Sequence, residues 1–367
     1  MHVAILGVRG IPANYGGFET CAEEISVRMV EQGHKVTVYC RKEDYETKLS
    51  DYKGVQLVYL PSIKGKVTET LSNTFFSIIH VLFKKTDIIY VMNAANGPLC
   101  LIPKIFGKKV VINVDGLEWK RKKWGWVAKK YYLFSEWFCS IIATRIISDA
   151  IGIKEYYKKK YKTDSTFIAY GANIEKSNNV GILEEYGLKP NEYFFVASRL
   201  EPENNADITI KAMELLNTDK KLIIAGGANY KSNYIKNIMQ TKDERIKFLG
   251  PIYKDGHIKE LHCNCFAYIH GNEVGGTNPA LLKAMGYGNM VFALDNIFNN
   301  EVLDDAGISY SYNPKDLAKK LQQIIDKPAD RIKYQSRAIN RIINHYSWPK
   351  ITNDYIRLFE SLSKNNR

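Results

Sequence analysis

The sequence has few of the features that mark membrane-spanning or disulfide-stabilised proteins. Its six cysteines lie in strand-like or helical contexts rather than in a short disulfide framework. The apolar run from Phe75 to Phe83, ended by Lys84-Lys85, is too short to span a bilayer. Met1-His2-Val3 enters a predicted strand without a signal peptide. We therefore expect a cytoplasmic protein.

Acidic residues are scarce relative to basic ones. The 367 residues include 52 Lys and Arg but only 39 Asp and Glu, a net charge of +13. This balance favours anionic partners, namely nucleotide phosphates, acidic lipid or nucleic acid, without choosing among them. The length suits two domains, and an apolar content of 45% is enough for two ordinary cores.

Metal-ligating residues are also sparse. His262-Cys263-Asn264-Cys265 has no second ligand pair at zinc-like spacing, so buried thiols explain it better than a metal does. We expect neither a bound metal nor a cofactor.

Two strand–loop–helix patterns carry most of the information. The first is an apolar strand at 3–6, a glycine-rich loop at 7–19 and an amphipathic helix at 21–30. The second is a strand at 194–198, a polar loop at 199–205 and a helix at 206–216. Glycines let a backbone approach an anion closely, and the N-terminus of the following helix offers unpaired N–H groups. Two such units predict an α/β protein with two Rossmann-like domains facing one cleft.

Strands and helices alternate along almost the whole chain, which predicts parallel sheets covered by helices on both faces. A polar stretch at 175–180 marks a linker, and the apolar periodicity after Tyr346 predicts a terminal helix that packs back across the domain junction. The predicted domains are thus 1–175, 176–345 and a returning helix at 346–367. The further predicted strands are 36–40, 55–60, 87–91, 109–113, 221–225, 266–270 and 290–294.

A third loop runs from His270 to Pro279 between a strand and a predicted helix at 280–287. Pro279 suits the first helical position and Asn278 a helix cap. The loop is either a second anion-receptive helix end or a tight turn that needs glycine for steric reasons.

Four stretches together resemble a known family: 7–20, 114–121, 248–251 and 270–285. They are similar to retaining glycosyltransferases with two Rossmann-like domains (the GT-B fold) of the large bacterial family 4, in the rhamnosyltransferase-like branch. The resemblance implies a nucleotide-sugar donor held by the C-terminal domain, an acceptor held by the N-terminal domain, and transfer with retention and without a metal.

The resemblance also assigns roles to individual residues. Arg199 would contact the donor diphosphate and stabilise the leaving group, and Asp115 would hold an acceptor hydroxyl, which makes these two the candidate catalytic residues. Two alternatives stay open, since Arg199 could neutralise Glu201 or Glu203, and Asp115 could cap a turn with Gly116. The remaining candidates are Gly16, Gly17, Gly275, Gly276, Thr277, Asn278 and Lys283 for the donor, and Tyr15, Phe18 and Glu118 for the acceptor.

The sequence departs from this family at the donor loop. Many relatives have two glutamates eight positions apart, where this chain has Gly275 and Lys283, with Glu273 two residues from the expected place. A lysine frequent in relatives is Asn204 here. These changes leave open a catalytically silent nucleotide-sugar-binding subunit. A dinucleotide dehydrogenase is a weaker rival, because the first loop lacks the Gly-x-Gly-x-x-Gly spacing.

The stretch 119–138 is rich in lysine and tryptophan, as an interfacial helix on anionic lipid requires. A solvated helix face and a platform for single-stranded nucleic acid are the alternatives. The run 75–83 is either a core helix or a second contact with the interface. We expect a peripheral enzyme on the inner face of the cell membrane that transfers a sugar, first of all rhamnose from dTDP-rhamnose, to a lipid-linked saccharide, with no nucleic-acid partner.

Overall fold

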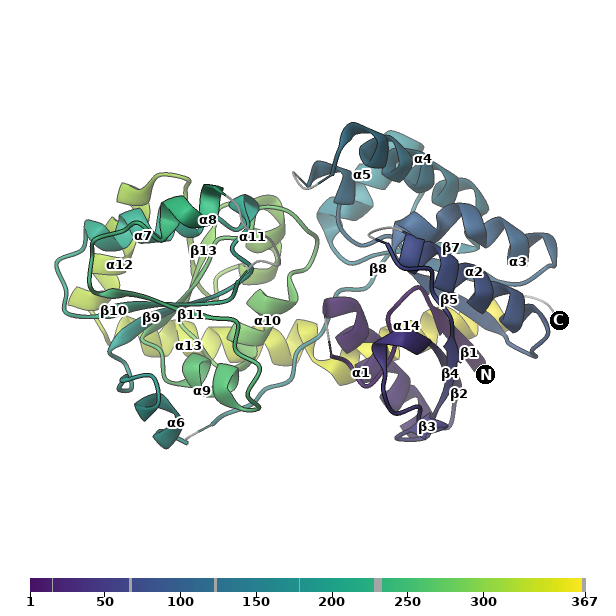
Figure 1. Ribbon diagram of the computed structural model, residues 1–367, viewed down its shortest axis with the longest axis horizontal. Helices are drawn as coiled ribbons and strands as arrows, with labels where there is room; N and C mark the ends of the chain where they lie inside the picture. Colours follow the sequence, from purple (N-terminus) through teal and green to yellow (C-terminus); the bar gives the residue numbers. More distant parts are fainter. Residues whose placement is uncertain (15, 66–67, 122–123, 178, 228–232, 365–367) are drawn as a thin grey trace. The chain divides into compact units, whose positions relative to one another are not determined.

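The computed structural model describes residues 1–14, 16–65, 68–121, 124–177, 179–227 and 233–364 (Figure 1). The chain divides into two compact units. The N-terminal unit comprises Met1–Tyr170 and Trp348–Arg367, and the C-terminal unit comprises Gly171–Ser347. Each unit is a helix-covered sheet.

The sheet of the N-terminal unit has the strand order β3-β4-β2-β1-β5-β6-β7-β8. All neighbouring strands are parallel except β3, which is antiparallel to β4. Its first strand, β1, lies between β2 and β5, so the chain order reverses there. The strands are β1 (His2–Leu6), β2 (Lys35–Arg41), β3 (Asp51–Tyr52), β4 (Val55–Leu60), β5 (Ile88–Met92), β6 (Val110–Asn113), β7 (Arg145–Ser148) and β8 (Thr166–Phe167).

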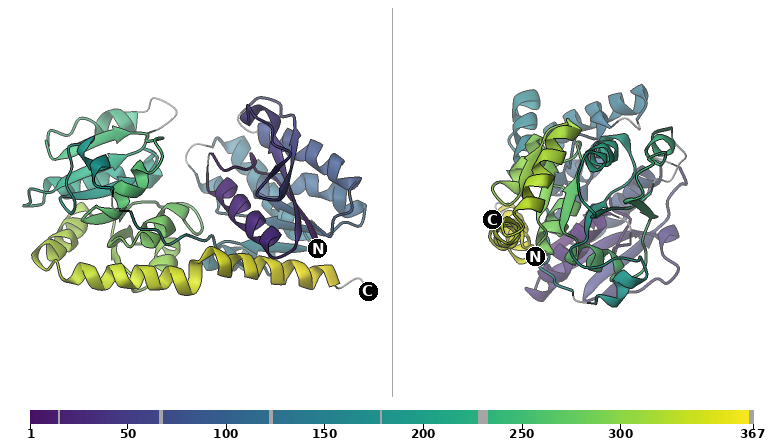
Figure 2. Two further views of the ribbon diagram at one scale, coloured as in Figure 1. Left: turned by 90° about the horizontal axis from the view of Figure 1, so that it is seen from below. Right: turned by 90° about the vertical axis from the view of Figure 1, so that its left-hand side faces the viewer.

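Helices cover this sheet, and the last helix of the chain is one of them. Helix α14 packs on α1, and its Tyr355 and Phe359 are buried in the N-terminal unit (Figure 2). The predicted return of the C-terminal helix is confirmed. The helices and 3-10 turns of this unit are α1 (Gly17–Glu31), η1 (Lys42–Asp44), α2 (Thr68–Leu82), η2 (Ala94–Cys100), α3 (Leu101–Ile105), η3 (Glu118–Lys120), α4 (Trp126–Ile142), α5 (Ile151–Tyr161) and α14 (Trp348–Lys364).

The C-terminal unit has a parallel sheet in the order β11-β10-β9-β12-β13-β14, and the chain order reverses between β9 and β12. Its strands are β9 (Tyr193–Ala197), β10 (Lys221–Ala225), β11 (Ile246–Gly250), β12 (Ala267–His270), β13 (Val291–Leu294) and β14 (Ile308–Tyr310). Its helical segments are α6 (Gly181–Glu184), η4 (Pro202–Asn204), α7 (Ala206–Glu214), α8 (Asn233–Ile238), α9 (His257–Cys263), α10 (Pro279–Gly286), α11 (Ile297–Leu303), α12 (Pro314–Asp326), α13 (Asp330–Arg341) and the π-helical turn η5 (Ile342–Tyr346).

The central strands form because continuous apolar segments can be buried on both faces of a parallel sheet. The side chains at 3–6 and 291–294 are fully buried. The predicted fold class, two parallel Rossmann-like domains, is confirmed. Among the described helices, none is both long enough and apolar enough to cross a membrane.

Candidate functional site

Both glycine-rich loops follow strands at the points where the strand order reverses. In open parallel sheets, ligands bind outside the carboxyl ends of the strands at such points. In the C-terminal unit, the loops after β9 and β12 carry Arg199 and the stretch 271–278. In the N-terminal unit, the loop after β1 leads into α1.

In the C-terminal unit, the two loops are packed directly on each other. A Cβ on Gly271 would lie 2.4 Å from the carbonyl oxygen of Asn204, so only glycine fits there. The Asn205 side-chain amide donates to the Gly271 carbonyl at 2.9 Å, and the Glu273 N–H donates to the Glu203 carbonyl at 2.9 Å. These contacts hold the loop of Arg199 against the loop after β12.

Arg199 extends from this pair of loops towards solvent. Its side chain is 55% exposed, and its Nη1 lies 3.6 Å from Oε1 of Glu201. The carbonyl of Arg199 accepts a hydrogen bond of 2.7 Å from the side-chain amide of Asn204. The contact with Glu201 is the other role that the sequence left open for Arg199, namely neutralising a glutamate. At 3.6 Å with a half-exposed guanidinium it leaves the other nitrogens available for an anion.

Buried polar atoms surround the same loops. Glu201, Glu203 and His270 are each less than a tenth exposed. Within the described part of the chain, Oε2 of Glu201, Oε1 of Glu203 and Nε2 of His270 have no hydrogen-bond partner. Burial lowers the pKa of His270 to about 3, so this imidazole is neutral. The sequence suggested Glu201 and Glu203 only as partners of Arg199 and gave His270 no role; their position after β9 and at the end of β12 is the signal that identifies them.

The loop before α10 has the predicted helix start. Asn278 caps the helix by accepting a hydrogen bond of 2.9 Å from the Ala280 N–H, and Pro279 is the first helical residue. Gly275 has φ +154°, and the space where its Cβ would lie is open. Gly276 and Thr277 are buried at this helix start. The loop therefore presents backbone at a helix N-terminus, as an anion site requires.

Lys283 is exposed on α10. Burial lowers the pKa of the nearby His262 to about 4, and the charge of Lys283 acts in the same direction. The Lys283 ammonium therefore lies within electrostatic reach of a buried imidazole. Nδ1 of that imidazole is 2.9 Å from Oδ1 of Asn289.

In the N-terminal unit, the glycine-rich loop is fastened to its own helix. The Arg9 N–H donates to Oε1 of Glu19 at 3.0 Å, and the Ala13 N–H donates to Oε2 of Glu23 at 2.6 Å. Gly16 is the N-cap of α1 and Gly17 its first residue. Both glycines thus lie at a helix N-terminus. Tyr15, a predicted acceptor residue, lies outside the described residues.

Asp115 and Phe18 are brought together through Tyr170. The Tyr170 hydroxyl donates to Oδ1 of Asp115 at 3.4 Å, and its ring meets that of Phe18 edge to face at 6.4 Å between centroids. Asp115 has φ +52°, and its N–H donates to Oδ1 of Asn113 at 2.9 Å. Asp115 and Phe18, two of the predicted acceptor residues, therefore lie at one location after β6 and β1.

Electrostatics distinguishes Asp115 from Glu118. Burial, and secondly the charge of Glu118, raise the pKa of Asp115 to about 6. Glu118 instead contacts Nε of Arg121 at 2.6 Å and accepts a hydrogen bond from the Trp124 indole at 3.1 Å. Its oxygens are already in contact with protein groups, so Asp115 is the better candidate for an acceptor contact.

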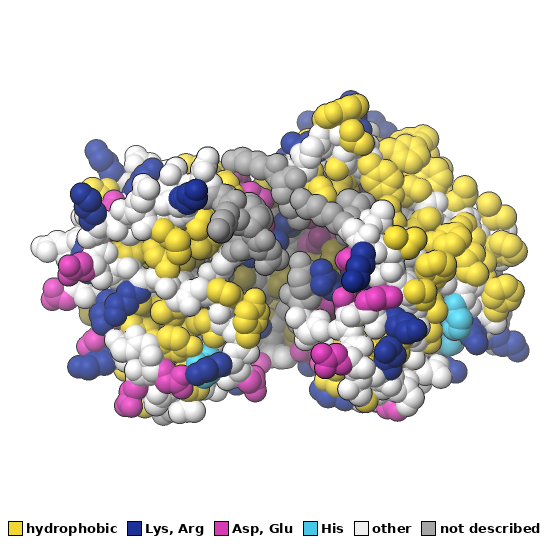
Figure 3. All heavy atoms as spheres, in the orientation of Figure 1, with side chains coloured by type: hydrophobic (Ala, Val, Ile, Leu, Met, Phe, Trp, Pro, Cys, Tyr) yellow, Lys and Arg dark blue, Asp and Glu magenta, His cyan; other side chains and the backbone are white. Residues whose placement is uncertain are grey.

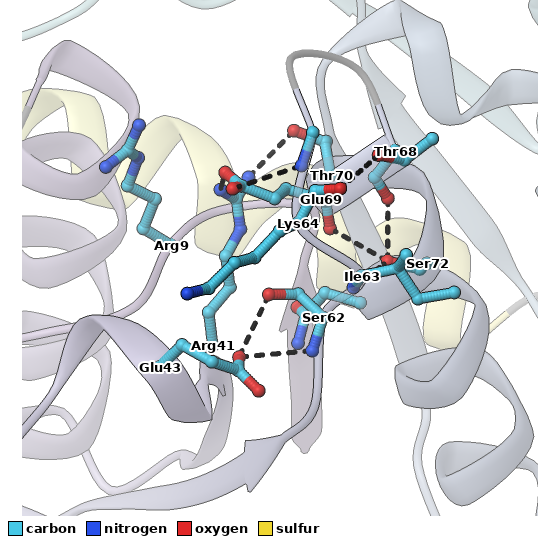
Figure 4. Close-up of polar contacts among 12 residues, drawn as sticks. Arg9, Arg41, Glu43, Ser62, Ile63, Lys64, Thr68, Glu69, Thr70 and Ser72 are labelled. Carbon is cyan, nitrogen blue, oxygen red and sulfur yellow. Dashed lines mark hydrogen bonds and ion pairs between the residues drawn. The ribbon is translucent and has the colours of Figure 1, made fainter.

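Arg41 lies beside the first glycine-rich loop and was not singled out from the sequence. It ends β2, is 6% exposed, and its N–H donates to the Arg9 carbonyl at 2.7 Å. Its guanidinium donates to the Thr70 hydroxyl at 2.7 Å and lies 3.5 Å from Glu69 (Figure 4). Burial, and secondly the charge of Arg9, lower its pKa. Arg9 and Arg41 thus lie next to each other at the carboxyl end of the strands.

Comparison with known proteins separates the two halves of the chain. Residues 182–342 match the family model described as glycosyl transferases group 1, and residues 1–173 match a domain of unknown function, DUF1972. An uncharacterised 42.6 kDa protein in the cps region of Klebsiella pneumoniae is 25% identical over 284 residues, 68% of this chain and 74% of that protein.

Several solved structures are similar over nearly the whole chain. Sucrose-phosphate synthase from Thermosynechococcus elongatus has a TM-score of 0.81 at 16% identity, covering 98% of both chains. Anabaena HepE, solved in complex with UDP, has a TM-score of 0.78 at 15% identity, covering 98% of this chain and 100% of its own. The C-terminal unit is thus similar to group 1 glycosyl transferases over residues 182–342, and the chain has the GT-B fold of two Rossmann-like domains.

Proposed function

We propose that this protein is a retaining glycosyltransferase that takes a sugar from a nucleoside diphosphate. The observation that supports this most is the paired loop at the strand reversal of the C-terminal unit, where Arg199 and the helix start at 275–279 share one edge of the sheet. Guanidinium and helix N-terminus both stabilise the diphosphate charge that develops as the glycosidic bond breaks. The match of the same unit to glycosyl transferases group 1 also supports a sugar-transferring activity.

In this proposal the donor contacts are Gly16, Gly17, Arg199 and the backbone of 275–278. The acceptor contacts are Asp115 and Phe18. The first-choice donor is dTDP-rhamnose and the acceptor is a lipid-linked saccharide, which fits a relative encoded in a cps region. We further propose that transfer needs no metal, and that the enzyme works on the cytoplasmic face of the cell membrane.

Product analysis tests the proposed activity. Purified protein is incubated with a panel of nucleotide sugars and membrane extract, with and without EDTA, and new lipid-linked saccharide is measured. Transfer from one donor, unchanged by EDTA, supports the proposal. Activity that EDTA abolishes and magnesium restores contradicts metal independence.

The Arg199 contact has its own test. Arg199→Ala should weaken nucleoside diphosphate binding by about 1.5–3 kcal/mol, the size of a lost charged hydrogen bond. Lys211→Ala is the matched control, since Lys211 is a similarly exposed cation of the same unit, on α7. Calorimetry that finds equal affinity for Arg199→Ala and wild type removes Arg199 from the site.

A silent nucleotide-sugar-binding subunit is the second candidate. It is favoured by Gly275 and Lys283, which replace the two glutamates of many relatives. Donor titration separates the two functions. A silent subunit binds donor without hydrolysing or transferring it, whereas a transferase turns it over slowly even without acceptor.

A further inference from the structure

The N-terminal unit carries a large apolar surface that its own fold does not cover. Of the large hydrophobic side chains exposed in the described part of the chain, twelve lie on or directly after α2, α3 and α4. Figure 3 shows apolar side chains gathered over these helices. The twelve are Phe75, Phe76, Ile79, Phe83, Leu101, Ile105, Phe106, Trp126, Val127, Phe134, Trp137 and Ile141. We call this the α2–α3–α4 face.

The helices of this face bury polar side chains beside apolar ones, and they expose aromatic and aliphatic side chains. In α2 the buried residues include Asn73, Thr74 and Ser77, while Phe75, Phe76 and Ile79 are exposed. The Asn73 amide donates to the Leu60 carbonyl at 2.9 Å, which fixes this orientation. A helix on the surface of a soluble protein normally presents charged and polar side chains to water instead. The run 75–83 is thus buried on one side, at Ile78 and Val81, and exposed on the other.

Helix α4 has a similar arrangement. Ser135 and Glu136 are buried, and Tyr156 and Tyr161 donate hydrogen bonds of 2.8 and 3.0 Å to the Glu136 carboxylate. The Ser135 hydroxyl donates to the Ala94 carbonyl at 2.6 Å. These bonds hold Ser135 and Glu136 on the protein, on the same side as the buried Cys139 and Ile142, and leave Phe134 and Trp137 outward.

The three helices form one surface because each packs on η2. Gly97 in η2 makes this possible for α4, since a Cβ there would lie 2.5 Å from Sγ of Cys139 and 2.9 Å from the carbonyl oxygen of Ser135. Monomeric soluble proteins rarely expose a contiguous apolar patch of this kind without a partner.

The charge of the residues around the α2–α3–α4 face indicates what kind of partner it binds. The segment 70–148 contains twelve Lys and Arg but only four Asp and Glu, and one of those four, Glu136, is buried. Lys84, Lys85, Lys104 and Lys130 are exposed beside or within the apolar face. Apolar and aromatic side chains flanked by lysines are what binding to the headgroup region of an anionic bilayer needs.

We infer that the α2–α3–α4 face docks on an anionic lipid bilayer, with Phe83, Ile105 and Phe106 among the inserted side chains. This deepens the proposed peripheral attachment: the face contains α4, the helical part of the stretch 119–138, and adds α2 and α3. At the start of that stretch, Trp119 and Trp124 contact protein groups instead. There Trp119 stacks near Lys160, at 5.3 Å from its Nζ to the ring centroid, and the Trp124 indole is bonded to Glu118.

Vesicle co-sedimentation of the full chain tests the inference, with no donor or acceptor present, so its failure is separate from failure of the proposed transfer. Wild type should bind vesicles of phosphatidylcholine with phosphatidylglycerol more strongly than phosphatidylcholine alone. A triple variant, Phe83→Ser, Ile105→Ser and Phe106→Ser, should lower the partition coefficient about tenfold or more. The control triple, Leu215→Ser, Met239→Ser and Ile332→Ser, changes exposed apolar residues of the C-terminal unit and should bind as wild type does.

A second measurement detects insertion through the tryptophans of the α2–α3–α4 face itself. Brominated lipids should quench tryptophan fluorescence of the wild type, and Trp126→Phe with Trp137→Phe should remove most of that quenching. Equal partition of both triples, or no quenching, overturns the inference. It is also overturned if wild type ignores vesicles and sediments as a dimer that the first triple dissociates, because the face would then bind a second copy.

Discussion

Asp115 combines a strained backbone with a perturbed carboxyl group. Its φ of +52° lies in the left-handed region, where aspartate and asparagine are among the few tolerated residues. Its pKa is raised to about 6, whereas a free aspartate has a value near 3.9. The folded protein therefore holds this proton more tightly than the unfolded chain does. Ionisation of Asp115 weakens the fold progressively between about pH 4 and pH 6.

Asp115→Asn should separate stability from activity. Above pH 6 the variant should be more stable than wild type by an amount on the order of 2 kcal/mol, and the gain should vanish near pH 4. Urea denaturation at several pH values measures this, with exposed Asp164→Asn as control. The proposed acceptor role requires that the stabilised variant lose transfer. A variant with full turnover would leave Asp115 only the turn-capping role.

Lys283 presents a different chemistry from the glutamate of many relatives. An ammonium has three donors and no acceptor, so it cannot accept hydrogen bonds from ribose hydroxyls. Its place one turn into α10 suits a phosphate contact instead. Lys283→Ala should weaken a nucleoside diphosphate more than a nucleoside, and Lys283→Glu should do so further by repulsion. Titration of both ligands decides the matter, because a gain with glutamate would indicate a decayed donor site.

At the scale of elements, the loops after β9 and β12 are held together because the backbone of Gly271 packs directly on the backbone of Asn204. Gly271→Ala should push the Asn204 backbone away, costing about 1–3 kcal/mol in stability and lowering nucleoside diphosphate affinity about tenfold. Gly181→Ala is the control, since the nearest atom to its Cβ would be 3.6 Å away. Unaltered nucleotide affinity in Gly271→Ala would show that the loops bind independently.

The elements also show what the sequence could and could not predict. The central strands were predictable because buried parallel strands are uninterrupted apolar runs. The short edge strand β14 and the strand β7, which follows the apolar end of α4, were not predicted. The glycine-rich loops were found because they directly follow strands. Arg41 was missed because its place beside Arg9 depends on β2 pairing with β1, and that pairing is set by topology.

Helix α2 illustrates the same limit for surfaces. Its sequence shows an apolar run. Which side of the helix faces inward also depends on the hydrogen bond that the Asn73 side chain donates to the carbonyl of Leu60, on β4. Local periodicity carries no information about such a tertiary bond. The outward position of Phe75 and Phe76 thus became visible only in the fold.

At the scale of the whole molecule, the chain leaves the N-terminal unit at residue 170 and re-enters it at Trp348. The stability of that unit therefore depends on residues that follow the C-terminal unit in the sequence. Phe359 is fully buried, and its ring lies 5.5 Å from that of Tyr90 on β5. The Tyr355 hydroxyl, one turn earlier, is 3.0 Å from the Tyr90 hydroxyl. Helix α14 thus supplies side chains to the core that packs against β5.

Phe359→Ala should consequently destabilise the unit that lies earlier in the sequence. Loss of a buried phenylalanine costs about 3–5 kcal/mol. Hydrogen exchange measured by mass spectrometry should show lost protection within residues 1–170 and little change within 171–347. Ile342→Ala, also at a fully buried position but in the C-terminal unit, should show the reverse pattern. If both variants lose protection equally throughout the chain, the two units unfold as one cooperative body, and α14 stabilises the molecule as a whole rather than the unit on which it packs.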